Sequence, residues 1–226
     1  MENEGDLMAE VKFSASMMCA DYGHLEAEIH ALEQAGIDSF HIDIMDGEFV
    51  HNFGMGIHDL RYIRSATRKS VEVHLMIKNP VRYVEMFSRI GVDVLYVHPE
   101  SEYHISTTIE EIINYGMTPA IVISPGHMTS AVLELLYVVK RVLVMGVNPG
   151  NAGQTYLPYL EEKISKLVML RERYGFEVFW DGHGSPDNVR KFAPLGVSGF
   201  VLGTAALFGK DKAYSDILCE LRGCCE

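Results

Sequence analysis

The sequence predicts an α/β protein built as a single (β/α)₈ TIM barrel. The chain has 226 residues, which fits one barrel better than two small domains. Hydrophobic residues make up 48% of it, enough to fill a sizeable core. Short β-branched or aromatic runs alternate with stretches of helical period in units of about 25 residues. An open doubly wound sheet is the alternative, but no dinucleotide-binding glycine pattern follows the first predicted strand.

Eight segments are expected to form strands, because each is short, apolar and rich in β-branched or aromatic residues. In chain order they are Val11–Ser16, Ser39–Ile44, Val71–Met76, Val94–His98, Thr118–Ile123, Arg141–Met145, Glu177–Asp181 and Gly199–Gly203.

Helical patterns fill the gaps between these strands. Pro80 marks one helix start, and four helices are expected to stop at Gly36, Gly91, Gly116 and Gly175. The predicted helices are His24–Ala35, Val81–Ile90, Thr107–Tyr115, Thr129–Val139, Leu160–Tyr174, Pro186–Ala193, Lys212–Arg222 and, with the weakest pattern, Ile57–Thr67. Residues 1–10 are expected to be an N-terminal extension and residues 11–226 the catalytic barrel domain.

Charge and hydropathy exclude several classes of partner. The formal net charge of −12 argues against a nucleic-acid partner, which usually requires a basic patch. No apolar run approaches the roughly 20 residues that a membrane span requires. The first ten residues are acidic and lack the basic and apolar regions of a signal peptide. We therefore expect a cytoplasmic protein with no membrane partner.

The four cysteines give no sign of a structural site. They are Cys19, Cys219, Cys224 and Cys225, and no two of them form a C-x-x-C pair. We expect free thiols in a reducing cytoplasm. The alternative, a disulfide or metal site at the tail, lacks the usual ligand spacing.

Side chains of the metal-binding type gather at predicted strand ends. His41 and Asp43 point the same way near the end of the second strand, His74 lies near the end of the third, and Asp181 closes the seventh. Active sites of such barrels occupy the C-terminal ends of the strands. Taken singly, each residue could be an ordinary polar or turn residue. Together, two imidazoles and two carboxylates predict a site for a divalent cation such as zinc, iron(II), cobalt or manganese.

Glycines follow the last three predicted strands, and the loops after strands seven and eight often bind phosphate in this fold. Glycine lets backbone N–H groups approach an anion closely, although ordinary turns also use it. The positions are Gly150, Gly153, Gly182, Gly184 and Gly203.

Three methionines, Met45, Met76 and Met145, also fall at predicted strand ends. They could form an apolar wall against a flat reacting group, or they could fill the core.

Several motifs resemble the ribulose-phosphate 3-epimerase family, in order, from about Val11 to Phe208. They are Phe40–Val50, His74–Met76, His98–Glu100, Met145–Gly150 and Asp181-Gly182. The resemblance implies a barrel of the ribulose-phosphate-binding type and reversible epimerisation at carbon 3 of a ketose phosphate. D-ribulose 5-phosphate and D-xylulose 5-phosphate are the expected pair.

The resemblance also implies roles for individual residues. His41, Asp43, His74 and Asp181 would bind one divalent ion per subunit, with zinc the first expectation, and Asp43 and Asp181 would be the catalytic acid/base pair. A homo-oligomer, from dimer to hexamer, is implied. The substrate-binding positions would be Ser16, Met45, Met76, Met145, Gly150, Gly153, Gly182, His183, Gly184, Gly203 and Thr204.

The chain departs from the family pattern around the substrate. Ala15 and His51 replace prolines, Asn151-Ala152 replaces Phe-Gly, His183 replaces a second glycine, and Gly203-Thr204 replaces Gly-Ser. Ala152 and Gly203-Thr204 resemble the branch acting on D-allulose 6-phosphate, whereas Asn148 resembles the pentulose enzymes. His183 could add positive charge near the phosphate, or it could point to solvent and use only its backbone.

Inversion of a carbon centre needs a proton removed on one face and returned on the other. Asp43 and Asp181 on opposite sides of a planar enediolate would do this, exchanging roles with reaction direction. A Schiff-base aldolase would need a strand-end lysine in the pocket, and none of the lysines falls there. The related decarboxylase group uses D-x-K-x-x-D, and Met45 stands where that lysine would be. A non-catalytic sugar-phosphate-binding protein would not need both aspartates.

Overall fold

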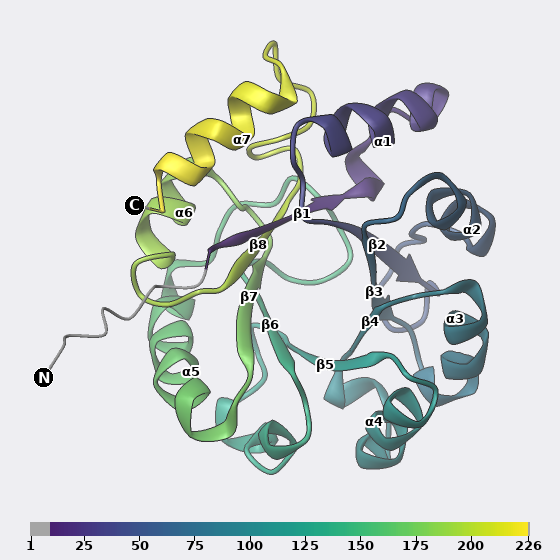
Figure 1. Ribbon diagram of the computed structural model, residues 1–226. Helices are drawn as coiled ribbons and strands as arrows, with labels where there is room; N and C mark the ends of the chain where they lie inside the picture. The colour runs from purple at the N-terminus through teal and green to yellow at the C-terminus, as the bar shows by residue number, and fades with distance from the viewer. Residues whose placement is uncertain (1–9, 226) are drawn as a thin grey trace, which may run out of the picture.

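Eight parallel strands close into a barrel in the computed structural model, which describes residues 10–225 (Figure 1). Each strand pairs with the next along the chain, and β8 returns to β1. The predicted (β/α)₈ barrel is therefore confirmed, with every strand end within one residue of its expected place. The strands are β1 Lys12–Ser16, β2 Ser39–Met45, β3 Ser70–Met76, β4 Val94–Val97, β5 Thr118–Ile123, β6 Arg141–Met145, β7 Glu177–Asp181 and β8 Gly199–Leu202. Of the expected N-terminal extension, residues 1–9 lie outside the described range.

Helices surround the barrel (Figure 1). They are α1 Leu25–Gln34, α2 Ile57–Ala66, α3 Val84–Ile90, α4 Ile105–Asn114, α5 Glu161–Tyr174, α6 Pro186–Phe192 and α7 Tyr214–Gly223. As the sequence predicts, Gly91 and Gly175 end α3 and α5 in the left-handed conformation, which glycine adopts without strain. Within residues 10–225, no helix is both long and apolar enough to cross a membrane.

The helix predicted over Thr129–Val139 is wrong. Two short 3₁₀ helices occupy the segment instead, η5 Thr129–Val132 and η6 Leu135–Tyr137. Thr129 does not cap the segment, because Met128 is the N-cap residue and supplies no side-chain hydrogen bond. β-Branched valines and an aromatic residue also favour helix only weakly, so an uncapped stretch of this length does not sustain one.

Strand alternation divides the core in two. On β2, Phe40, Ile42 and Ile44 face outward and pack with the helices, while His41 and Asp43 face inward. A separate apolar cluster fills the barrel interior from the side of β4 to β8; it consists of Val94, Tyr96, Ala120, Val122, Leu143, Met145, Val147, Phe179 and Val201. The inward positions of β1 to β3 are mostly polar instead, apart from Met45 and Met76 at the strand ends, and this polar half of the interior carries the site described below.

Close packing at the end of β7 fixes its neighbours. The buried Trp180 packs against Phe192 of α6, with ring centroids 4.9 Å apart, and its Nε1 donates to the carbonyl oxygen of Gly182 at 2.8 Å. Gly146 approaches this ring so closely that a Cβ there would lie 2.1 Å from Trp180 Cζ2. A side chain at residue 146 is therefore excluded unless the strand end moves.

A buried ion pair lies in the polar half of the interior. Arg141 Nη1 donates to Glu72 Oε1 at 2.6 Å, and Arg141 Nε donates to Glu177 Oε2 at 3.0 Å. Ser14 and Tyr96 also donate to Glu72, at 3.3 and 3.4 Å. Burial opposes the charge of Glu72, but its neighbours His41 and Arg141 outweigh burial, so the pKa of Glu72 is lowered. Glu72 therefore stays ionised inside the barrel.

We expect Arg141→Met to destabilise the metal-free protein by about 3–5 kcal/mol, because it leaves the buried Glu72 carboxylate without its cation. Urea unfolding followed by far-UV circular dichroism measures the change. Arg190→Met is the matched control, since Arg190 pairs with Asp187 on the surface and its loss should cost at most about 1 kcal/mol. Equal losses in the two variants would contradict the interpretation.

Candidate metal centre

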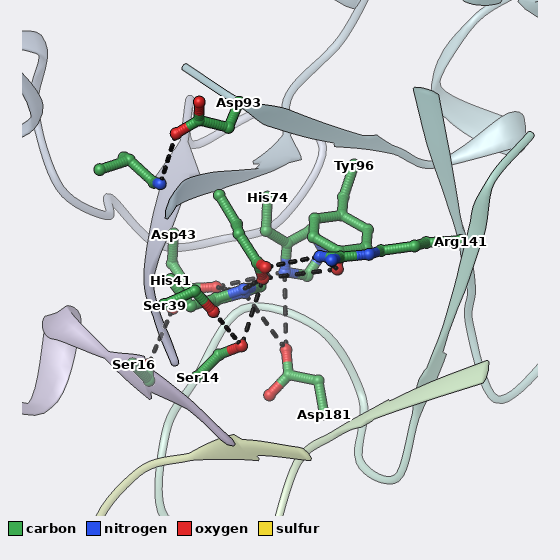
Figure 2. A network of polar contacts seen from close by, with 12 residues as sticks. Ser14, Ser16, Ser39, His41, Asp43, His74, Asp93, Tyr96, Arg141 and Asp181 are labelled. Atoms are coloured by element: carbon green, nitrogen blue, oxygen red, sulfur yellow. Dashed lines mark hydrogen bonds and ion pairs between the residues drawn. The ribbon is translucent and has the colours of Figure 1, made fainter. Parts of the chain in front are cut away.

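Four side chains converge at the C-terminal end of the barrel. His41 and Asp43 come from β2, His74 from β3 and Asp181 from the last position of β7. Strand pairing places Asp43 directly beside His74. Each residue offers one ligand atom, and the four atoms all lie within 4.8 Å of one another (Figure 2). The structure thus brings together the four residues that the sequence analysis singled out as ligands.

The distances show which atoms face the centre. His41 Nε2 lies 3.5 Å from Asp43 Oδ1 and 3.9 Å from Asp181 Oδ2. His74 Nδ1 lies 3.2 Å from Asp43 Oδ1 and 3.6 Å from Asp181 Oδ2. The other oxygen of Asp43, Oδ2, accepts a hydrogen bond from Ser16 Oγ at 3.0 Å. One nitrogen from each histidine and one oxygen from each aspartate therefore meet at one point.

The unsatisfied atoms of His41 fit a cation at this point. Its imidazole is fully buried, and neither ring nitrogen has a hydrogen-bond partner among the described residues. A buried polar atom left without a partner costs about 1–3 kcal/mol. A divalent cation bound by Nε2 would remove that cost at Nε2, and two imidazoles with two carboxylates suit zinc, iron(II), cobalt or manganese.

The field at the centre favours positive charge. Burial opposes a charged His41, but the negative charge of Asp43, with smaller contributions from Glu72 and Asp181, outweighs it and raises the pKa of His41 to about 10. Burial likewise opposes a charged His74, yet its hydrogen bonds and the charges of Asp181 and Asp43 raise the pKa of His74. Burial opposes the charge of Asp43 as well, but the two histidines hold the pKa of Asp43 far below its usual range. Protons or a cation can supply this positive charge.

A pocket opens above the four ligands. Asp43 and Asp181 line it, whereas His41 and His74 lie buried beneath it. All eleven positions that the resemblance assigns to substrate binding line the same pocket: Ser16, Met45, Met76, Met145, Gly150, Gly153, Gly182, His183, Gly184, Gly203 and Thr204.

Cys19 also lines this pocket, a position that sequence reasoning missed because no spacing rule singles out a lone cysteine. Burial raises the pKa of its thiol, so the neutral form is favoured. Cys19, Cys219 and Cys224 are free thiols, as the sequence predicts.

His183 has an unusual backbone. Its φ is 56°, in the left-handed region that costs a non-glycine residue free energy, and this explains why glycine also suits the position. Asn188 Nδ2 and the N–H of Ser185 both donate to its carbonyl oxygen, at 2.8 and 2.7 Å. The ring Nδ1 lies 3.1 Å from the carbonyl oxygen of Gln154, so the imidazole contacts the loop after β6.

Two further buried groups surround the ligands. Glu72 Oε2 lies 3.9 Å from His41 Nδ1, the nitrogen that faces away from the centre. His98 Nε2 lies 2.8 Å from His74 Nε2, and burial together with the charge of His74 lowers the pKa of His98 to about 4 despite its contact with Glu100. The sequence analysis quoted His98 and Glu100 as part of a motif but gave them no role. His98 is the last residue of a predicted strand and Glu100 follows two residues later, so their position near a strand end, like that of the ligands, was the available signal.

Comparison with known proteins identifies relatives along nearly the whole chain. The sequence model of the ribulose-phosphate 3 epimerase family matches residues 12–208. The ribulose-phosphate 3-epimerase of Methanocaldococcus jannaschii is 36% identical over 212 residues, covering 92% of this chain and 88% of that protein. The chloroplastic ribulose-5-phosphate-3-epimerase of Arabidopsis thaliana is 34% identical over 209 residues, covering 91% and 74%.

Similarity to solved structures extends to the fold alone. The phosphoribosyl anthranilate isomerase of Thermus thermophilus superposes with a TM-score of 0.65, covering 95% of this chain and 98% of that chain. Its sequence is only 12% identical, so the likeness supports the barrel and nothing about the reaction.

We expect purified protein to bind one zinc ion per chain and to lose this binding in His74→Ala. The affinity loss should exceed the roughly 10–100-fold that substitution of a residue behind a ligand costs, because a ligand itself is removed. Equilibrium dialysis with elemental analysis measures the stoichiometry, and competition with a chromophoric chelator measures the affinity. His58→Ala, on the outer helix α2, is the control and should bind zinc as the wild type does. Unchanged affinity in His74→Ala would contradict the assignment of the centre.

Proposed function

The chain belongs to the ribulose-phosphate 3-epimerase family and is an isomerase of that family, and from this premise we propose that it interconverts D-ribulose 5-phosphate and D-xylulose 5-phosphate. One observation carries the proposal: two aspartates, Asp43 and Asp181, line the same pocket with their ligand oxygens within 4.8 Å of each other. The relatives are ribulose-phosphate 3-epimerases, which supports ribulose 5-phosphate as one partner of this pair.

The cation would be held by His41, Asp43, His74 and Asp181. When bound, it supplies Lewis-acid stabilisation of negative charge on the substrate oxygens next to the reacting carbon. The hydrogen to be removed lies beside a ketone, so its removal leaves an enediolate. The remaining chemistry falls to the side chains of this chain.

The two carboxylates are proposed to act from opposite faces of the enediolate. One removes the proton from carbon 3, and the other returns a proton to the opposite face, which inverts the centre. The hydroxyl of Ser16 donates to Asp43 Oδ2 at 3.0 Å and so fixes the orientation of that carboxylate. Asp181 is the more open of the two, with 16% of its side chain exposed against 7% for Asp43. The roles exchange when the reaction runs backward.

An apolar wall would protect the flat intermediate. Met45 and Met76 are direct neighbours across β2 and β3, and both pack with Val50. Met145 lies directly beside Asp181 across β6 and β7. Methionine is flexible and polarizable, so this wall can adapt to either epimer. It also limits the access of water to the intermediate.

The phosphate would bind at the loops after β6, β7 and β8. Gly182 has a φ of 95°, and a Cβ at Gly184 would lie 2.8 Å from the carbonyl oxygen of Val201, so side chains are disfavoured at both positions. Bare backbone at these positions lets N–H groups approach an anion. A local backbone site of this kind accommodates a phosphate despite the net charge of −12. His183 lies on the rim of the same loops.

We expect Asp181→Asn to reduce epimerisation by at least about 10²–10⁴-fold, the usual contribution of a general acid or base, while the barrel still folds. The amide keeps an oxygen toward the cation but cannot take the proton. Turnover of ribulose 5-phosphate in the zinc-loaded variant measures the loss, and circular dichroism checks the fold. Near-normal inversion would contradict the scheme with two carboxylates.

The matched control is Asp211→Asn on the exposed surface, which should epimerise at the wild-type rate. Asp43→Asn gives the complementary test. If the carboxylates serve opposite faces, any residual exchange of the carbon-3 hydrogen with solvent deuterium will be confined to one epimer in Asp43→Asn and to the other epimer in Asp181→Asn. Exchange into both epimers at equal rates in either variant would rule out this division of labour.

We expect the zinc-loaded protein to show a higher kcat/KM for D-ribulose 5-phosphate than for D-allulose 6-phosphate. The measurement is a comparison of both substrates, with loss of the carbon-3 hydrogen followed by NMR in deuterium oxide. Ala152 and Thr204 line the pocket and are the positions that resemble the hexulose branch. A preference for allulose 6-phosphate would replace the proposed substrate and leave the reaction type unchanged.

A further inference from the structure

A chain of hydrogen bonds runs from His74 away from the metal centre. His74 Nε2 lies 2.8 Å from His98 Nε2, and His98 Nδ1 lies 3.0 Å from Ser124 Oγ. Ser124 Oγ in turn donates to Glu100 Oε1 at 2.5 Å, and that oxygen also lies 3.4 Å from His98 Nδ1. The chemistry above assigns no role to His98, Ser124 or Glu100.

The carboxylate of Glu100, at the far end of this series of hydrogen bonds, determines which group donates in each of them. An ionised carboxylate only accepts, so Ser124 must donate its single proton to Glu100. Ser124 Oγ then accepts from His98, which places the proton of a neutral His98 on Nδ1. His98 Nε2 is left with a lone pair and accepts from His74 Nε2. Burial alone would raise the pKa of Glu100, but its contacts with His98 and Ser124 outweigh burial and lower the pKa to about 2, so the carboxylate stays charged.

The same directions determine the tautomer of a neutral His74. A neutral imidazole carries one proton, and His74 holds it on Nε2 when that nitrogen donates to His98. His74 Nδ1 is then left with a lone pair, and Nδ1 is the nitrogen that faces Asp43 and Asp181. A cation binds the unprotonated nitrogen of a neutral imidazole. The hydrogen-bond chain thus holds the tautomer that a metal ligand requires.

We propose that His98, Ser124 and Glu100 are positioning residues that hold His74 as a cation ligand through Nδ1, an inference that rests on the proposed metal-dependent function. The negative charge of Glu100 also polarises each hydrogen bond of the series, which makes His74 Nδ1 a stronger electron donor to the cation.

We call the hydrogen-bonded series His98, Ser124 and Glu100 the relay. Its outer end is held in place by a neighbouring helix. Lys163 of α5 donates from its ammonium group to the carbonyl oxygens of Ser124, Pro125 and His127, each at 2.8 Å. These bonds hold the loop after β5 and therefore the hydroxyl of Ser124. His98 itself is fully buried directly after β4, and its ring packs against Phe49 with centroids 4.8 Å apart.

His41 lacks such a relay. Its outward nitrogen, Nδ1, faces Glu72 Oε2 at 3.9 Å, which is too long for a hydrogen bond. Of the two histidine ligands, His74 is therefore the one whose outward nitrogen has a hydrogen-bond partner. Loss of the relay should weaken cation binding through His74 alone.

Zinc affinity tests the proposal without reference to turnover. We expect His98→Leu to weaken zinc binding by about 10–100-fold, measured by competition with a chromophoric chelator. His98→Gln should recover most of the affinity, because its amide offers both an acceptor and a donor. Glu100→Gln, at the partly exposed end of the relay, should lose affinity in the same direction while keeping the fold. Glu110→Gln, the same replacement on the exposed surface of α4, should bind zinc as the wild type does.

A purely structural role predicts a different pattern. It would lower the stability of the metal-free protein in His98→Leu and leave the zinc affinity of every folded variant unchanged, and that result would overturn the proposal. Nitrogen-15 NMR of the zinc-loaded, histidine-labelled protein gives an independent readout. We expect His98 with its proton on Nδ1 and a lone pair on Nε2, and a proton on His98 Nε2 would overturn the proposal.

Failure of the proposed epimerase function and failure of the relay proposal would give different results. A wild-type protein that binds zinc but epimerises no ketose phosphate would end the proposed function, while the affinity series would still support or overturn the relay. An active enzyme whose zinc affinity is the same in wild type, His98→Leu and Glu100→Gln would overturn the relay alone.

Discussion

The register between β2 and β3 is the constraint on which the site depends. Asp43 stands directly opposite His74, and Met45 stands opposite Met76, so two neighbouring strands deliver both a pair of ligands and a pair of wall residues. Side chains alternate between faces with a period of two, so a slip of one residue would turn His41 and Asp43 toward the helices. The outward neighbours Phe40 and Ile42 prevent that slip, because their burial between sheet and helices would be lost.

The same alternation gathers charge on one side of the barrel. Glu72 lies two residues before His74 on the inward face of β3, and Arg141 reaches it from β6 across the interior. The ionised Glu72 and the four ligands therefore share a polar half, while Leu143, Phe179 and their neighbours fill the other half with apolar side chains. The apolar half contributes hydrophobic stabilisation, which offsets the cost of burying the ionic groups.

Much of this arrangement was predictable from the sequence because strand period and strand ends are local signals. The eight strands and the four ligands follow from such signals, and the barrel then brings strand ends together. The segment Thr129–Val139 was predicted wrongly because an apolar period alone does not supply a cap. The contact of His98 with Ser124 could not be predicted, because these two residues meet only through the pairing of β4 with β5. Nor does the sequence show that the His183 ring contacts the loop after β6.

The packing of Trp180 gives the protein an intrinsic optical reporter. The chain has one tryptophan, and it is fully buried at the position before Asp181, with its indole N–H bound to the carbonyl oxygen of Gly182. Emission from this protein therefore originates beside the last ligand and the first glycine of the loop that follows β7. Any rearrangement of that strand end on occupation of the pocket changes the surroundings of the fluorophore, so ligand titrations need no introduced label.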